Sequence, residues 1–206
     1  GTTVIGGAPY ESNHFNNREG YVTAHKLVDL KSKNENFDII KFGSDINGEG
    51  ANDESGYSVS LNAEGNIMAI GSRNNGSSAG HVRVYDYVKN RNPEWKQLGL
   101  DIDNASPGDH SGFSISLSDV GYIVAIGAPY SSGGGSLSGS TMVYKYLEGQ
   151  GGFPSMWVKM GDNINGAGAN NNSGWSVSLN GSGNILAIGA LYDDNINGSN
   201  AGSEII

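Results

Sequence analysis

Oxygen-bearing side chains recur at fixed spacing ahead of three Ser-Gly pairs in this chain of 206 residues. The three sets are Asp45, Asn47 and Asp53; Asp101, Asp103 and Asp109; and Asn163, Asn165 and Asn171. Carboxylate and amide oxygens are the ligands that calcium prefers, so the first two sets are candidate metal sites for Ca²⁺. The same side chains also bond their own backbone in turns, which needs oxygen but no charge. Because the third set carries only Asn, the sequence favours turns over calcium sites.

The run Asp109, His110 and Ser111 supplies the side-chain types of a nucleophilic triad. Neighbours in sequence do not adopt triad geometry, and the counterparts of His110 in the other copies are Glu54 and Asn172. We therefore expect a turn here and assign no catalytic residue. The remaining histidines have no metal-ligand spacing: His14, His25 and His81.

These residues belong to a unit that the chain repeats. Its clearest part begins at Ser55, Ser111 and Ser173, reads Ser-Gly-aromatic-Ser-x-Ser-Leu, and continues to an Ala-Ile-Gly segment. The repeat is 56 residues long from Ser55 to Ser111 and 62 residues long from Ser111 to Ser173, and the extra residues lie in loops. A unit copied along one chain buries its apolar face against its neighbours, so this repeat determines the architecture.

Each copy contains four strand candidates, which in the first copy are 39–42, 57–61, 67–71 and 81–87. In the second candidate, Ser58 and Ser60 should point away from Val59 and Leu61. The third is apolar and should be buried on both faces, and its small residues would let sheets approach closely. The fourth alternates in polarity, which suits a more exposed outer position.

Four antiparallel strands per unit, at a period near that of known blades, predict an all-β fold: a β-propeller of four-stranded antiparallel blades rather than a sandwich array. Glycine accounts for 33 residues and the apolar islands are short, which disfavours helices. The predicted units are 1–37, the second half of a blade plus a linker; 38–93 and 94–155, one blade each; and 156–206, a blade ending in its fourth strand. About three and a half blades would be part of a larger propeller.

The recurring segments resemble the FG-GAP-type β-propeller repeats found in integrin α-subunit heads. The aromatic-glycine pair of that family corresponds, in reversed order, to Gly56-Tyr57, Gly112-Phe113 and Gly174-Trp175, and 125–129 reads Ala-Ile-Gly-Ala-Pro. The resemblance covers essentially the whole chain, and it implies an extracellular propeller used for adhesion, recognition or assembly. The calcium loops of the family are degenerate here, because the turns at Gly65, Gly121 and Gly183 carry at most one acid each. We expect plain tight turns with positive φ at these glycines.

Charge and composition narrow the range of partners. Twelve Lys and Arg against 21 Asp and Glu give a net charge of −9 at pH 7, which disfavours nucleic acid and anionic membranes. No apolar run approaches the roughly 18 residues of a membrane span, so no membrane insertion is predicted. The absence of cysteine removes disulfides and thiolate sites. Five N-x-[ST] sequons favour a secreted glycoprotein: Asn75, Asn104, Asn171, Asn180 and Asn197.

The sequence therefore predicts a non-enzymatic extracellular or cell-surface protein with a structural, adhesive or assembly role, such as an appendage, filament or matrix component. Its partners would be other subunits, further blades of the same polypeptide, or glycans. The first alternative is a calcium-dependent ligand- or carbohydrate-binding head, and the second is a propeller enzyme with a site on its loops. Six aromatic residues could form a sugar platform but more simply pack between sheets: Tyr85, Tyr87, Trp95, Tyr144, Tyr146 and Trp157.

Overall fold

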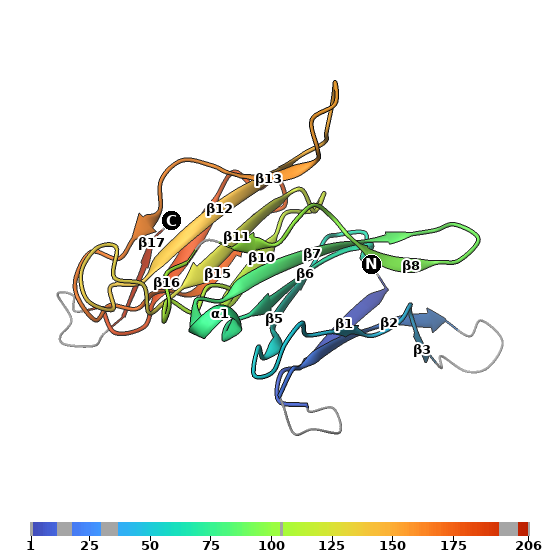
Figure 1. The fold of residues 1–206 in the computed structure, drawn as a ribbon, viewed down its shortest axis with the longest axis horizontal. Coiled ribbons are helices and arrows are strands. Elements are labelled where there is room, and N and C mark those ends of the chain that lie inside the picture. Colours follow the sequence, from blue (N-terminus) through green and yellow to red (C-terminus); the bar gives the residue numbers. More distant parts are fainter. Residues whose placement is uncertain (1, 12–17, 30–36, 104, 194–201, 206) are drawn as a thin grey trace.

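The described part of the protein is almost entirely β-structure. The computed structural model describes residues 2–11, 18–29, 37–103, 105–193 and 202–205 (Figure 1). Its single described helix, α1 (Asn75–Ser78), is one distorted turn with positive φ at Gly76 and Ser77. None of the described helical residues forms a segment long and apolar enough to span a membrane. The prediction of an all-β fold is confirmed.

The described strands form four antiparallel sheets that follow one another along the chain (Figure 1). Sheet 1 contains β1 (Thr3–Ala8), β2 (Tyr21–Asp29), β3 (Phe37–Lys41) and β4 (Ile46–Asn47). Sheet 2 contains β5 (Ser55–Leu61), β6 (Ile67–Ser72), β7 (His81–Val88), β8 (Glu94–Gln97) and β9 (Ile102–Asp103). Sheet 3 contains β10 (Ser114–Leu117), β11 (Ile123–Ala128), β12 (Ser140–Leu147), β13 (Met156–Lys159) and β14 (Ile164–Asn165). Sheet 4 contains β15 (Ser173–Leu179), β16 (Leu186–Ala190) and β17 (Ser203–Ile205).

The sheets are divided along the chain differently from the predicted units. Strand β8 pairs with β7, and β13 pairs with β12. Each is therefore the outer strand of the preceding sheet and not the first strand of a new one. Likewise, β3 pairs with β2. The units predicted at 38–93, 94–155 and 156–206 each start with two strands that pair within the preceding sheet, since sheets 2, 3 and 4 begin at or just after a Ser-Gly pair. A repeat reveals the length of a unit but not its starting point, because every starting point gives the same period.

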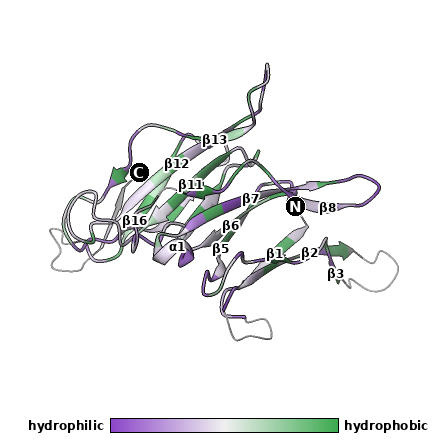
Figure 2. Cartoon of the chain, in the orientation of Figure 1, coloured by the Kyte–Doolittle hydropathy of each residue, from purple (hydrophilic) through white to green (hydrophobic). Residues whose placement is uncertain are grey.

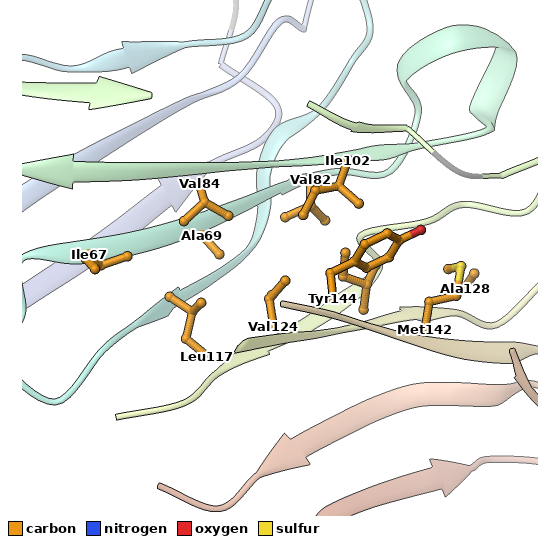
Figure 3. Packing of buried hydrophobic residues seen from close by; sticks show 11 residues of the cluster. Ile67, Ala69, Val82, Val84, Ile102, Leu117, Val124, Ala128, Met142 and Tyr144 are labelled. Carbon is orange, nitrogen blue, oxygen red and sulfur yellow. The ribbon is translucent and has the colours of Figure 1, made fainter. Parts of the chain in front are cut away.

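The core lies between sheets rather than within one of them. Strand β6 is buried along its whole length, as predicted. The larger cluster packs five residues of sheet 2 against six of sheet 3: Ile67, Ala69, Val82, Val84 and Ile102 against Leu117, Val124, Ile126, Ala128, Met142 and Tyr144 (Figure 3). A second cluster joins Val22 of sheet 1 to Met68, Ile70 and Tyr85 of sheet 2. Hydrophobic residues accordingly concentrate on the strands (Figure 2).

Two expectations about exposure and turns have opposite outcomes. The fourth strand of the unit, β7, is not exposed, because residues 81–85 are buried between sheets 1 and 3 and β8 and β9 pair along its edge. The tight turns are as predicted, with φ of 70° at Gly65, 80° at Gly121 and 72° at Gly183. Reversing the chain direction within two residues requires this left-handed conformation, which only glycine adopts without steric cost.

Candidate functional site

Two serines of the inner strand in sheet 2, and two in sheet 3, bind the backbone of the next sheet. The Ser58 Oγ donates to the carbonyl oxygen of Gly112 at 2.7 Å, and the Ser60 Oγ accepts from the N–H of Leu117 at 3.0 Å. The next junction repeats both bonds, from Ser114 to the Gly174 oxygen at 2.8 Å and from the Leu179 N–H to Ser116 at 3.0 Å. The prediction that Ser58 and Ser60 share one face is confirmed, and this face is the one that holds the next sheet.

A glycine in the neighbouring strand makes room for that contact. A Cβ atom on Gly71 would lie 2.2 Å from the carbonyl oxygen of Gly112, and one on Gly127 would lie 2.1 Å from that of Gly174. Both distances are far below a van der Waals contact, so any side chain here would force the sheets apart. The small residues of the third strand therefore permit the close approach that the sequence predicted.

The aromatic residues that follow the Ser-Gly pairs form a row across three sheets. The ring centroids of Tyr57 and Phe113 are 5.0 Å apart, and those of Phe113 and Trp175 are 4.7 Å apart. At the first end of this row, the Arg73 guanidinium lies 3.8 Å from the Tyr57 ring centroid, and its Nε donates to Glu54 Oε2 at 2.7 Å. Burial lowers the pKa of Arg73, but the hydrogen bond and charge of Glu54 outweigh burial, so this pKa lies above its ordinary value.

In sheet 4 the equivalents of the two junction serines face solvent. The side chains of Ser176 and Ser178 are exposed, and neither has a hydrogen bond to another described residue. They line a groove of about 340 Å³ together with Gly189. Among the described residues, the three atoms nearest to a Cβ on Gly189 would all belong to Ser176. We call Ser176, Ser178 and Gly189 the open face. It is a third copy of a surface that, in sheets 2 and 3, holds the next sheet.

The serine bonds can be tested one junction at a time. Replacing Ser114 with Ala should lower the free energy of unfolding by about 1 kcal/mol, because the carbonyl oxygen of Gly174 loses its donor. The matched change Ser176→Ala should have almost no effect, because its hydroxyl faces solvent. Urea unfolding followed by far-UV circular dichroism measures both values, and equal losses would contradict the difference between the two faces.

The large aromatic residues of the outer strands pack between sheets. The Trp95 Nε1 donates to the carbonyl oxygen of Phe42 at 2.9 Å, and the Trp157 Nε1 donates to that of Leu98 at 2.7 Å. Tyr85 and Tyr144 are buried. This is the packing role that the sequence favoured over a sugar platform.

Most of the candidate calcium ligands bond within their own turns or to neighbours. Asp45 pairs with Lys41 at 2.7 Å. Asp53 Oδ2 accepts from the Gly50 N–H at 2.7 Å, and Asp109 Oδ2 accepts from the Ser106 N–H at 3.0 Å. Asn47 pairs with Tyr21 in the ladder between β4 and β2, and its carbonyl oxygen accepts from Arg83 Nη2 at 2.9 Å. Asp101 Oδ1 likewise accepts from Gln97 Nε2 at 2.5 Å.

Asp101 and Asp103 also lie around His81, a residue that sequence reasoning left unassigned. The Nδ1 atom of His81 is 3.9 Å from Asp101 Oδ2 and 3.7 Å from Asp103 Oδ1. Glu49, which was also missed, lies 3.9 Å from the same nitrogen. Burial, followed by the charge of Arg83, lowers the pKa of His81, while the three carboxylates act in the opposite direction.

The turn expected at Asp109-His110-Ser111 is confirmed. His110 has φ of 55°, and its counterparts Glu54 and Asn172 have φ of 55° and 53°. Ser111 is completely buried, and its Oγ has no hydrogen-bond partner among the described residues.

The sequons differ in how far their side chains are engaged. Asn171 is buried and its Nδ2 donates to Asp193. The Oδ1 of Asn180 accepts from the N–H groups of Asn184 and Ile185 at 3.0 Å each. Asn75 opens α1 and is partly exposed. Asn104 and Asn197 lie outside the described residues.

Consecutive antiparallel sheets that pack on one another, with the same serine and glycine contacts repeated at two junctions, define a repeat protein of the β-propeller type. The FG-GAP repeat family matches residues 165–204, which include all of sheet 4 but its last residue. The matched segment contains the third Ser-Gly copy, and the match agrees with the FG-GAP-type β-propeller repeats that the sequence resembles.

Solved structures of other proteins resemble this chain to different degrees, and one of the three named here has a TM-score above 0.5. A putative 6-phosphogluconolactonase from Bacteroides uniformis matches with a TM-score of 0.52 and 11% identity, over 89% of this chain and 47% of that one. Sqt1 from Chaetomium thermophilum gives a TM-score of 0.41 at 14% identity, over 73% and 35%. Hydrazine synthase from Kuenenia stuttgartiensis gives 0.39 at 14% identity, over 82% and 47%. This chain thus spans about half the length of the first of these proteins, and the likeness concerns the fold alone. A search of curated proteins found no match.

Proposed function

We propose that this chain is a non-enzymatic extracellular or cell-surface protein with a structural, adhesive or assembly role. We further propose that its open face seats another FG-GAP-type blade. The observation that supports this proposal is the triplicate junction surface, which holds a neighbouring sheet in its first two copies and faces solvent in its third.

The two filled junctions specify the chemistry of the occupant. It would be an inner strand reading Ser-Gly-aromatic-Ser-x-Ser-Leu, whose Gly carbonyl oxygen accepts from Ser176 and whose Leu N–H donates to Ser178. Its aromatic ring would extend the row beside Trp175, which already lies 4.7 Å from Phe113. Strand addition of this kind gains affinity from backbone hydrogen bonds and specificity from alternate side chains.

A second region supports the same occupant. Gly43 and Gly99 each face the indole ring of an outer-strand tryptophan, Trp95 and Trp157. Their counterpart Gly161 has no described atom within 4 Å of an added Cβ. An incoming polypeptide that also supplied the outer strand of sheet 4 would place its tryptophan there. The proposed partner is therefore a continuation of the repeat, from the same polypeptide or from another one.

This proposal can be tested by adding such a continuation to the chain. Ile206 aligns with Val84 in the repeat, so a copy of residues 85–147 appended after Ile206 would add the outer strand of sheet 4 and a following blade. Because the chain contains no cysteine, Ser176→Cys creates a unique thiol on the open face. In the extended chain this thiol should react with an alkylating reagent at least roughly tenfold more slowly than in the original chain, because access requires local opening.

The control is Gly189→Ala in the same extended chain, which should restore fast alkylation because the added Cβ blocks the incoming backbone. Equal rates in the original and the extended chain would contradict the assembly role of the open face.

The cellular location has its own test: antibodies against this chain should label intact cells of the source organism, or their surroundings, without permeabilisation. Labelling only after permeabilisation would contradict a surface location.

A further inference from the structure

One group of charged and metal-ligating side chains lies outside the open face, where sheet 1 meets sheet 2. His81 is the first residue of β7 and pairs directly with Asp103 of β9, while Asp101 lies just before β9. Glu49 comes from sheet 1, two residues after β4. Strand pairing and sheet packing therefore bring together side chains from three separate stretches of the chain.

We propose that Glu49, His81, Asp101 and Asp103 bind a divalent transition-metal cation, with Zn²⁺ as its representative, between these two sheets. This site goes beyond the proposed function and does not depend on it. It also differs from the set Asp101, Asp103 and Asp109, because Asp109 bonds within its own turn.

The distances around His81 suit ligands of one ion better than hydrogen-bonded partners. Its Nδ1 lies 3.7 to 3.9 Å from one oxygen of each carboxylate, which is beyond hydrogen-bond length. Ligand atoms of Glu49, His81 and Asp101 all lie within 4.8 Å of one another. Two ligands of a tetrahedral zinc ion are about 3.4 Å apart, given bond lengths of about 2.0 to 2.2 Å. Small side-chain movements would close the difference, and the side chains of Glu49 and Asp103 are exposed.

The burial of His81 is the second observation that points to a ligand. Only 1% of this residue is exposed, yet its Nδ1 faces three carboxylates without a hydrogen bond to them, and its Nε2 has no hydrogen-bond partner among the described residues. An imidazole held in place without polar partners is costly unless something else satisfies it.

The donor set selects the class of cation. Calcium prefers six to eight oxygen ligands, whereas imidazole nitrogen with carboxylate oxygen suits zinc and related transition metals. Arg83 opposes any cation here, since its Nη1 lies 3.4 Å from Glu49 Oε1. Three carboxylates nevertheless outweigh this one positive charge, and Arg83 Nη2 is bonded to the carbonyl oxygen of Asn47.

The other copies of the repeat lack this combination. The pair of His81 and Asp103 corresponds by register to Tyr21 and Asn47 in sheet 1 and to Ser140 and Asn165 in sheet 3. Glu49 corresponds to Ala105 and Ala167 in sequence. The other junctions thus show that the fold does not need these ligands, so their coincidence at one junction calls for another explanation.

Isothermal titration of the chain, free of any histidine tag, with ZnCl₂ and separately with CaCl₂ tests the site. We expect one zinc ion per chain and no calcium binding at the same concentrations. Zinc should raise the melting temperature by roughly 5 to 10 °C at hundredfold excess over Kd, since it binds only the folded state. NMR of ¹⁵N-labelled His81 should show the coordinated Nδ1 directly.

The repeat supplies the variants. His81→Ser, which copies Ser140, should abolish zinc binding, and Asp101→Asn, which copies Asn163, should weaken it on the order of tenfold or more. Glu49→Ala changes an exposed side chain, so it tests the site even if His81→Ser fails to fold. Asp109→Asn is the control and should bind zinc normally. The absence of zinc binding, or equal binding by the chain and its Glu49→Ala and Asp101→Asn variants, would overturn the proposal.

Discussion

Replacing Gly127 with Ala should lower the free energy of unfolding by about 2 to 3 kcal/mol, as overpacking of a tight contact does. The added Cβ would lie 2.1 Å from the carbonyl oxygen of Gly174, so sheets 3 and 4 would have to separate. That separation would also weaken the bond from Ser114 to the same oxygen. Gly127 does not have a positive φ, so the loss would come from the junction and not from backbone strain.

Gly189→Ala is a closely matched control for this change. The new Cβ would meet the Oγ of the adjacent serine at 2.3 Å in Gly127→Ala and at 2.4 Å in Gly189→Ala. A serine hydroxyl can rotate away, so this shared contact is cheap. Only Gly127 also faces the backbone of a following sheet. Gly189→Ala should therefore change stability by less than about 0.5 kcal/mol. Urea unfolding gives both values, and a large loss in Gly189→Ala would show that the open face is not free.

Replacing Arg73 with Leu should cost about 3 kcal/mol, because it leaves the carboxylate of Glu54 buried without its partner. The side chain of Glu54 is 7% exposed, and its Oε2 lies 2.7 Å from Arg73 Nε. The change also removes the guanidinium from the face of the Tyr57 ring, where it lies 3.8 Å from the centroid. Urea unfolding at neutral pH measures the loss.

The repeat offers a compensating change for this variant. In sheet 4 the counterparts of Arg73 and Glu54 are Leu191 and Asn172. The double variant Arg73→Leu with Glu54→Asn should therefore recover most of the stability, with a remaining loss of about 1 kcal/mol, because no charge is left buried. A double variant as unstable as Arg73→Leu alone would mean that the ring contact, rather than the charge of Glu54, accounts for the loss.

Several features that repeat could be predicted from the sequence, whereas residues that do not repeat could not. The alternation of Ser58 and Ser60 with Val59 and Leu61 identified the two faces of β5, because side chains alternate along any strand. The apolar run at β6 indicated burial on both faces. The exposure of β7 was predicted wrongly, because alternation does not show whether another strand covers the edge. The starting point of each sheet has no signal in the sequence, because the outer strand does not show which neighbouring sheet it joins.

The candidate sites show the same division. The repeat identified Asp53 and Asp109 as turn residues, because their counterpart Asn171 carries no charge. It gave no reason to group His81 with Glu49, since these residues are 32 positions apart and lie on different sheets. The signal that could have found them is departure from the repeat: His81 replaces Tyr or Ser, and Glu49 replaces Ala.

The junctions place the four sheets in a row, in which sheets 1 and 4 are the terminal members. Every described hydrophobic residue with no exposed surface belongs to sheet 2 or sheet 3: Ala69, Ile70, Val82, Val84, Val124, Ala125, Ile126 and Ala128. Sheets 1 and 4 have a described neighbour on one side only, and each neighbour adds its own contribution to the stability of a sheet. Thermal fluctuations should therefore open the chain from its two outer sheets inward. A blade seated on Ser176 and Ser178 would move one of those ends further along, so growth of the row would slow the fraying of everything behind it.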